Sequence, residues 1–81
     1  MSILIVYSNY TRKFVDYCVD MLTEAGYTVQ SMDKDQAASE YNLEIRLLPS
    51  FYIVKAGIPA YPMYGIQNMD TILNWAKSAN I

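Results

Sequence analysis

A continuous apolar run and then a helical repeat of apolar residues open the chain, and they predict a strand followed by a helix. Residues 3–7 form a continuous apolar run rich in β-branched side chains, which is typical of a strand buried on both faces, and we expect this strand over residues 2–7. From Phe14 onward the apolar positions recur at helical spacing, so a helix is predicted over residues 11–25, ended by Gly26. Its apolar stripe consists of Phe14, Val15, Cys18, Val19 and Leu22.

A second strand and a short helix are predicted next. Residues 27–32 alternate between apolar and polar side chains with a period of two, which indicates a strand. The polar segment after them is a turn, in which Asp33 or Asp35 can cap a helix over residues 36–42. A strand–helix–strand order implies a right-handed crossover, so the first two strands should pair in parallel.

The second half of the chain predicts a hairpin and a final helix. Residues 51–55 and 61–64 are apolar strands separated by a turn of hairpin length. Pro62 cannot donate a backbone hydrogen bond, which indicates that the last strand lies at an edge of the sheet. A helix over residues 69–79 closes the chain. Its candidate caps are Asn68 and Asp70.

Size and composition narrow the class of protein. The 81 residues make one α/β domain, residues 1–81, and a hydrophobic content of 53% suits so short a chain because it must bury its core efficiently. The net charge is −2 and the six basic residues are scattered, which argues against a nucleic-acid partner. No apolar run approaches the ~20 residues of a membrane span, and no signal-peptide pattern opens the chain. We therefore expect a cytoplasmic protein that binds neither nucleic acid nor membrane.

Cysteine and histidine content limits the chemistry further. One cysteine excludes a disulfide within the chain, and the absence of histidine argues against a zinc site of the usual Cys/His kind. Cys18 lies on the apolar stripe of the first helix, away from the helix start where a thiol pKa is lowered. We interpret it as an inert thiol of the core.

The junction between the first strand and the first helix carries a resemblance to a known family. Its sequence is Val6-Tyr7-Ser8-Asn9-Tyr10-Thr11-Arg12-Lys13-Phe14. Thioredoxins carry an aromatic residue and then Cys-x-x-Cys directly after such a strand. In this register Tyr10 takes the aromatic place, and Thr11 and Phe14 take the two cysteine places. The chain therefore resembles the thioredoxin/glutaredoxin superfamily, as a small glutaredoxin-like member without the Cys-x-x-Cys pair.

Further segments resemble the same family, in the same order along the chain. Leu48-Pro49-Ser50 precedes the third predicted strand, where the family has a cis-proline that faces the redox loop. A hairpin follows, Gly65 comes directly after the fourth strand, and a helix containing Leu73 and Trp75 ends the chain. The resemblance implies a thioredoxin-like fold, β-α-β-α-β-β-α, with a four-stranded mixed sheet. Its first and third helices should cover one face and its second helix the other.

The resemblance also implies a binding surface without redox chemistry. A dithiol–disulfide exchange needs an attacking thiolate and a resolving thiol, and neither stands in this loop. The family would place a cis Leu48-Pro49 bond beside the loop, with backbone groups of Leu48 free to pair with an extended ligand. We predict a redox-inactive module that binds an extended segment of a protein partner and needs no cofactor or metal. The predicted site consists of Tyr10, Thr11, Arg12, Lys13, Leu48, Pro49, Gly65 and Ile66.

Two other functions stay open at this stage. The chain could be a diverged glutaredoxin-like disulfide oxidoreductase or glutathione-dependent enzyme, in which Thr11 or Tyr10 stabilises a bound glutathione thiolate. Glutaredoxins hold glutathione with a Gly-Gly turn and a polar pair, whereas here Tyr64 replaces one glycine and residues 67–68 match the pair in part. The chain could also be a purely structural subunit of a larger assembly.

Each residue of the loop also has a structural interpretation. We favour Thr11 as the N-cap of the first helix, because threonine is a common cap, and Phe14 as a core residue. Thr11 is not expected to act as a nucleophile, because a hydroxyl needs a nearby base and the chain has no histidine. Arg12 and Lys13 are either solvated charges or, together with the positive end of the helix, an attractor for an anionic group of a partner.

Overall fold

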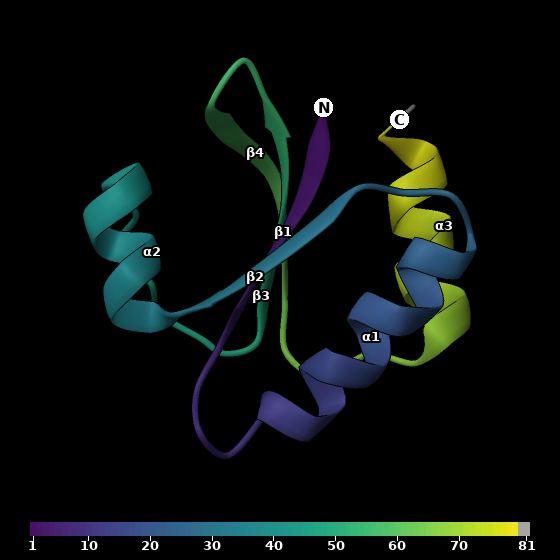
Figure 1. Cartoon of the computed structure of the whole chain (residues 1–81), viewed down its shortest axis with the longest axis horizontal. Helices are drawn as coiled ribbons and strands as arrows, with labels where there is room; N and C mark the ends of the chain where they lie inside the picture. The colour runs from purple at the N-terminus through teal and green to yellow at the C-terminus, as the bar shows by residue number, and fades with distance from the viewer. Residues whose placement is uncertain (80–81) are drawn as a thin grey trace.

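Four strands and three helices alternate along the chain in the predicted order in the computed structural model, which describes residues 1–79. The chain is an α/β protein with one mixed sheet, as predicted from the sequence (Figure 1). The elements are β1 (Ser2–Tyr7), α1 (Arg12–Glu24), β2 (Val29–Asp33), α2 (Lys34–Tyr41), β3 (Ser50–Lys55), β4 (Ile58–Tyr64) and α3 (Met69–Ser78).

The sheet has four strands in the order β2-β1-β3-β4. β1 and β2 run parallel, as the strand–helix–strand order predicted, and β3 is antiparallel to both β1 and β4. Ser50, the first residue of β3, lies opposite Val6 of β1 on one side and Tyr64 of β4 on the other. The end of β1, the start of β3 and the end of β4 therefore meet at one end of the sheet (Figure 1, bottom).

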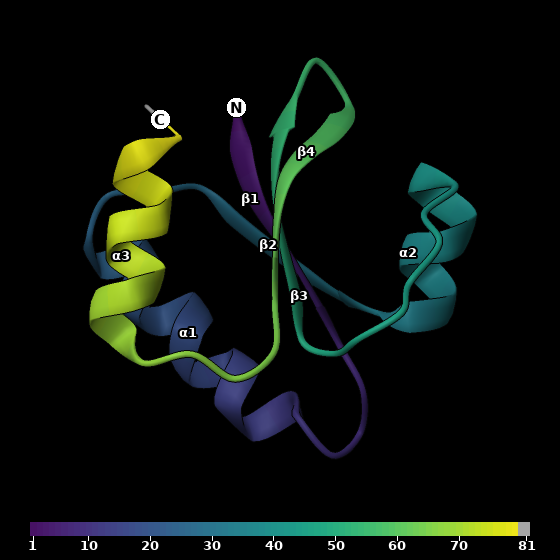
Figure 2. The same ribbon diagram turned by 180° about the vertical axis from the view of Figure 1, so that it is seen from behind.

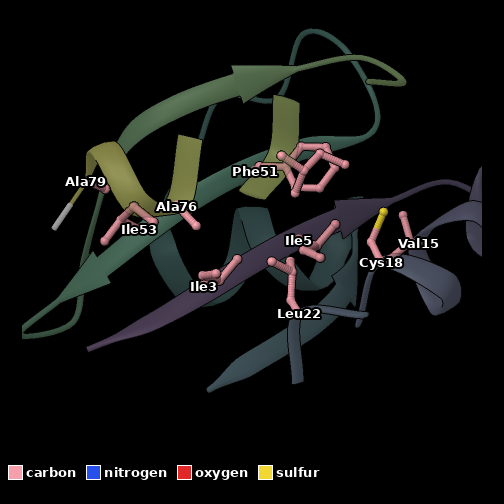
Figure 3. Packing of buried hydrophobic residues seen from close by; sticks show 10 residues of the cluster. Ile3, Ile5, Val15, Cys18, Leu22, Phe51, Ile53, Ala76 and Ala79 are labelled. Atoms are coloured by element: carbon pink, nitrogen blue, oxygen red, sulfur yellow. The ribbon is translucent and has the colours of Figure 1, made fainter. Parts of the chain in front are cut away.

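Helices α1 and α3 cover one face of the sheet, where the larger part of the core lies. Ile3, Ile5, Phe51 and Ile53 project from the strands toward these helices and are fully buried. Ten buried residues form this cluster, and Cys18 of α1 is one of them, which confirms its expected place in the core (Figure 3). Phe51 also contacts Trp75 edge to face, with 6.0 Å between the ring centroids.

Helix α2 and the loop that follows it cover the other face (Figures 1 and 2). Ala37 is the buried residue of this helix, and it packs against the alternate side chains of the strands. This second cluster of buried residues consists of Leu4, Val6, Met32, Ala37, Tyr52 and Val54. The two faces confirm the expected division of the helices, with two on one side and one on the other.

Two of the three helices begin at side-chain caps that the sequence predicted. The Asp33 carboxylate accepts a hydrogen bond from the backbone N–H of Gln36 at 2.8 Å, and Asn68 Oδ1 accepts one from the N–H of Thr71 at 2.8 Å. Because Asp33 rather than Asp35 is the cap, α2 begins two residues earlier than expected. It ends at Tyr41, and the next residue, Asn42, has a φ of 55° in the left-handed region.

The hairpin between β3 and β4 is tighter than the sequence suggested. Ala56 and Gly57 form its two-residue turn, with φ values of 52° and 76°, so β4 begins at Ile58 instead of residue 61. The longer strand now includes two prolines, Pro59 and Pro62. β4 tolerates both because it lies at the edge of the sheet, as Pro62 predicted.

Candidate functional site

Three connections converge at one end of the sheet, and together with the first turn of α1, which holds Arg12 and Lys13, they carry every residue of the predicted site. They are the β1–α1 loop, the α2–β3 loop and the β4–α3 loop (Figure 2, bottom). The N–H of Gly65 donates a hydrogen bond to the carbonyl oxygen of Pro49 at 2.8 Å, which joins the second loop to the third. Leu48 lines a pocket with Tyr7 and Ser8, which joins the second loop to the first.

Thr11 stands at the N-cap position of α1, but its hydroxyl does not cap the helix. Thr11 Oγ1 accepts a hydrogen bond from the backbone N–H of Ser8 at 3.0 Å, so the side chain closes the turn before the helix. The prediction of a capping hydroxyl is therefore wrong, and the backbone gives the reason. Thr11 has a ψ of 2°, whereas the capping residues Asp33 and Asn68 have the extended ψ values of 168° and 163° that aim a side chain at the helix N–H groups.

The start of α1 presents an exposed aromatic ring and two cations. Tyr10 is 100% exposed. The Arg12 guanidinium lies over the ring of Tyr7, 5.5 Å from its centroid, which fixes one cation against the end of β1. Lys13 is exposed, and the first turn of α1 contains no acidic residue that would neutralise either charge.

Thr11 and Phe14 are the residues that the resemblance aligns with two cysteines, and here Thr11 closes a turn while Phe14 is partly buried against the larger core cluster. The sulfur of this chain lies elsewhere, at Cys18 in the second turn of α1. Burial raises the pKa of the Cys18 thiol to about 11. A thiol with that pKa is protonated at neutral pH, so it is a poor nucleophile.

The α2–β3 loop forms the base of the site. The Leu48-Pro49 peptide bond is cis, as the resemblance implied, and Pro49 and Ser50 are buried while Leu48 is partly buried. The Ser50 hydroxyl donates a hydrogen bond to the carbonyl oxygen of Leu47. Gly65 packs beside this loop with a φ of 84°, a backbone conformation that favours glycine.

Apolar side chains around this base remain exposed, and the sequence indicated only some of them. Ile66 is 68% exposed and Tyr64 is 44% exposed. Leu47 is 54% exposed, with its Cδ2 4.0 Å from the position that a Cβ on Gly65 would take. We call Leu47, Tyr64 and Ile66 the apolar rim. The sequence did not identify Leu47 as a site residue, because Leu47 belongs to an apolar segment before Pro49 and such segments are equally typical of buried parts of a protein.

A pocket of about 350 Å³ lies next to this end of the sheet, between the β1–α1 loop and the start of α2. It exists because β1 and β2 are parallel and in a register that pairs Tyr7 with Asp33, so both strands end at the same place. It is lined by Tyr7, Ser8, Asn9, Asp33, Lys34, Asp35 and Leu48. Only Leu48 belongs to the predicted site. The sequence identified the acidic segment as a turn and gave no signal that it would face Asn9.

This end of the sheet offers surfaces for contact. Within residues 1–79, no group of histidine, cysteine, aspartate or glutamate side chains is arranged to hold a metal ion. None of the helices formed by these residues has the length and apolar character needed to cross a bilayer. The arrangement offers exposed apolar and aromatic side chains, two cations, and a buried loop base.

Comparisons with family models, curated proteins and solved structures found no match to this chain. The assignment of a function therefore depends on the geometry of the site.

Proposed function

We propose that this chain is a thioredoxin/glutaredoxin-like module without redox chemistry, which binds a segment of another protein at the end of the sheet where its three loops converge. The β-α-β-α-β-β-α order, the strand order and the division of the helices between the two faces support the thioredoxin-like topology. The resemblance of residues 6–14 and 48–50 to the family supports the location of the site.

One observation carries the proposal: exposed apolar side chains gather around the buried base of the site. The apolar rim lies beside Pro49 and Gly65, and the fully exposed Tyr10 lies in the adjoining loop at the same end of the sheet. Exposed apolar groups that cluster instead of standing singly are typical of interaction surfaces. Tyrosine and arginine are both enriched in protein interfaces, and Tyr10 and Arg12 stand together here.

The hydrogen bonds of the loops argue against a glutathione-dependent enzyme. The Thr11 hydroxyl, one of the two groups that could stabilise a bound thiolate, already donates a hydrogen bond to the carbonyl oxygen of Ser8 at 3.3 Å. Gln67 Nε2 donates to the carbonyl oxygen of Tyr64 at 2.8 Å, and the Asn68 side chain caps α3. The polar pair that could hold glutathione is therefore engaged within the protein.

Two isoleucines allow a matched test. Ile66 in the apolar rim is 68% exposed and Ile58 beside the hairpin turn is 67% exposed, but they lie at opposite ends of the sheet. Peptides are selected from a displayed random library against the natural chain, and their affinities are then measured for Ile66→Ser and Ile58→Ser. We expect Ile66→Ser to weaken binding about tenfold or more and Ile58→Ser to leave it unchanged.

Two results would contradict the proposal. One is a library that yields no specific peptide, and the other is an equal loss of affinity in the two isoleucine variants. A disulfide-reduction assay with glutathione serves as the control for the enzymatic alternative. Turnover by the natural chain in that assay would favour an enzyme.

A further inference from the structure

The two edges of the sheet differ in what they offer to another strand. At β4, Pro59 and Pro62 have no N–H, and the pairing with β3 is irregular between Phe51 and Ile53, near Tyr61 with its positive φ of 52°. Trp75 Nε1 also donates a hydrogen bond to the Tyr61 carbonyl oxygen at 3.0 Å. This edge therefore lacks a regular row of free backbone groups, a device that protects edge strands from pairing with other chains.

The β2 edge has none of these protections. The N–H of Ile3 donates to the carbonyl oxygen of Thr28 at 2.8 Å. Alternate residues of a parallel strand bond to the same neighbour, so Gln30 and Met32 also face β1. The N–H and C=O groups of Val29 and Ser31, and the N–H of Asp33, therefore point away from the sheet. β2 runs across the front of Figure 1 with α2 on one side and α1 on the other, and no described residue forms an element in front of it.

We infer that β2 pairs with β2 of a second copy of this chain, antiparallel and around a two-fold axis at Ser31. In this register the N–H of each Ser31 donates to the C=O of Ser31 in the other copy. The N–H of each Asp33 donates to the C=O of Val29 in the other copy. The same register places Gln30 opposite Met32 and Asp33 opposite Val29, so no like charges face each other across the pair of strands.

A second copy fits this edge because the edge is complementary to itself. The outward groups of Val29, Ser31 and Asp33 are spaced evenly on either side of the axis, so one operation satisfies both copies, as an isologous interface requires. Val29 and Tyr27 are only partly buried at this edge, and pairing would cover them further. The protected β4 edge prevents continuation of the sheet, so the assembly closes as a dimer.

The dimer should be weak, because a single pair of short strands buries less surface than a stable interface needs. Its interface lies along an edge that includes none of the residues of the partner-binding site proposed above. The inference therefore stands independently of the proposed function.

Sedimentation velocity of the natural chain, from about 1 µM to about 1 mM, tests the inference. We expect a monomer at the low end and a growing dimer fraction at the high end. Ser31→Lys places two like charges at the axis and should raise the dissociation constant about tenfold or more. Ser39→Lys adds the same charge on the exposed surface of α2 and should leave it nearly unchanged.

Amide exchange locates the interface at residue resolution. The N–H of Ser31 should exchange more slowly as the protein concentration rises, whereas the N–H of Gln30, which is bonded within the sheet, should not depend on concentration. A natural chain that remains monomeric at about 1 mM would overturn the inference. This holds even if the β2 edge then proves to bind a segment of another protein. Equal effects of the two lysine variants, or protection at Tyr64 in place of Ser31, would also overturn it.

Discussion

The two faces of the sheet differ in how completely the helices and loops that cover them are buried. On the α1/α3 face, two helices bury Val15, Cys18, Leu22, Ile72 and Ala76 completely against the strands. On the α2 face, one short helix contributes Ala37, and the loop that follows it leaves Leu48 partly covered and Leu47 exposed. A chain this short has little apolar surface to spare. The contrast indicates that stability comes mainly from the first face, which leaves the exposed loop residues beside the second face free for the binding role proposed above.

Truncation of one side chain on each face gives the largest expected difference. Phe51→Ala removes a fully buried ring that also contacts Trp75, and should lower the free energy of unfolding by about 3–5 kcal/mol. Leu48→Ala removes a partly buried side chain and should cost about 1–2 kcal/mol. Denaturant unfolding measures both, and equal losses would show that the two faces stabilise the fold alike.

The pH dependence of stability sharpens the same contrast. Burial raises the pKa of Cys18 from 9.0 to about 11, so above pH 9 the unfolded thiol ionises while the folded one stays protonated. The unfolded state then binds fewer protons than the folded state, and stability falls as the pH rises from 9 to 11, by about 2–3 kcal/mol in total from this group. Well below pH 9 the Cys18 thiol is protonated in both the folded and the unfolded state, so it adds no pH dependence to the free energy of unfolding.

Cys18→Ala isolates the contribution of the Cys18 thiol to this pH dependence. The variant should lose some stability at pH 7 because it leaves a small cavity, yet its stability should fall less steeply between pH 9 and pH 11. Unfolding curves of both proteins across this range measure the difference. Identical slopes would mean that the Cys18 pKa is not raised by the core of the α1/α3 face.

The starts of α1 and α3 offer a second comparison, with smaller expected differences in the free energy of unfolding. Asn68→Ala removes a true cap from α3 and should cost about 1 kcal/mol. Thr11→Ala removes the hydrogen bonds between its hydroxyl and Ser8, which close a partly exposed turn, and should cost about 0.5 kcal/mol. Thermal unfolding of the two variants compares them directly. A larger loss for Thr11→Ala would mean that the turn before α1 contributes more to stability than a helix cap does.

Much of the fold could be predicted from the sequence because its signals are local. The apolar stripe of α1, Pro62 of β4 and the capping side chains Asp33 and Asn68 each act through neighbours in the chain. These signals predicted the order of the elements, the parallel pairing of β1 with β2 and the edge position of β4, and the structure confirms each. Element boundaries moved where one turn residue decided the outcome, as at Ala56.

The candidate site was less predictable because it depends on which distant segments cover which side chains. Leu47 is exposed beside Gly65, which lies far from it in the sequence. The pocket forms at the point where the register of the parallel strands pairs Tyr7 with Asp33. The error at Thr11 has a similar origin, since a single backbone angle decides whether its hydroxyl reaches the helix or the turn. None of these three features leaves a periodic pattern in the sequence.

The most direct test of the proposed binding surface is a chemical-shift map of the labelled protein titrated with its tightest selected peptide. We predict that the shifted backbone amides concentrate in residues 8–13, 47–48 and 64–67, at the end of the sheet where the three loops converge. Shifts that instead concentrate along β2 or around the Ala56–Gly57 turn would contradict the account.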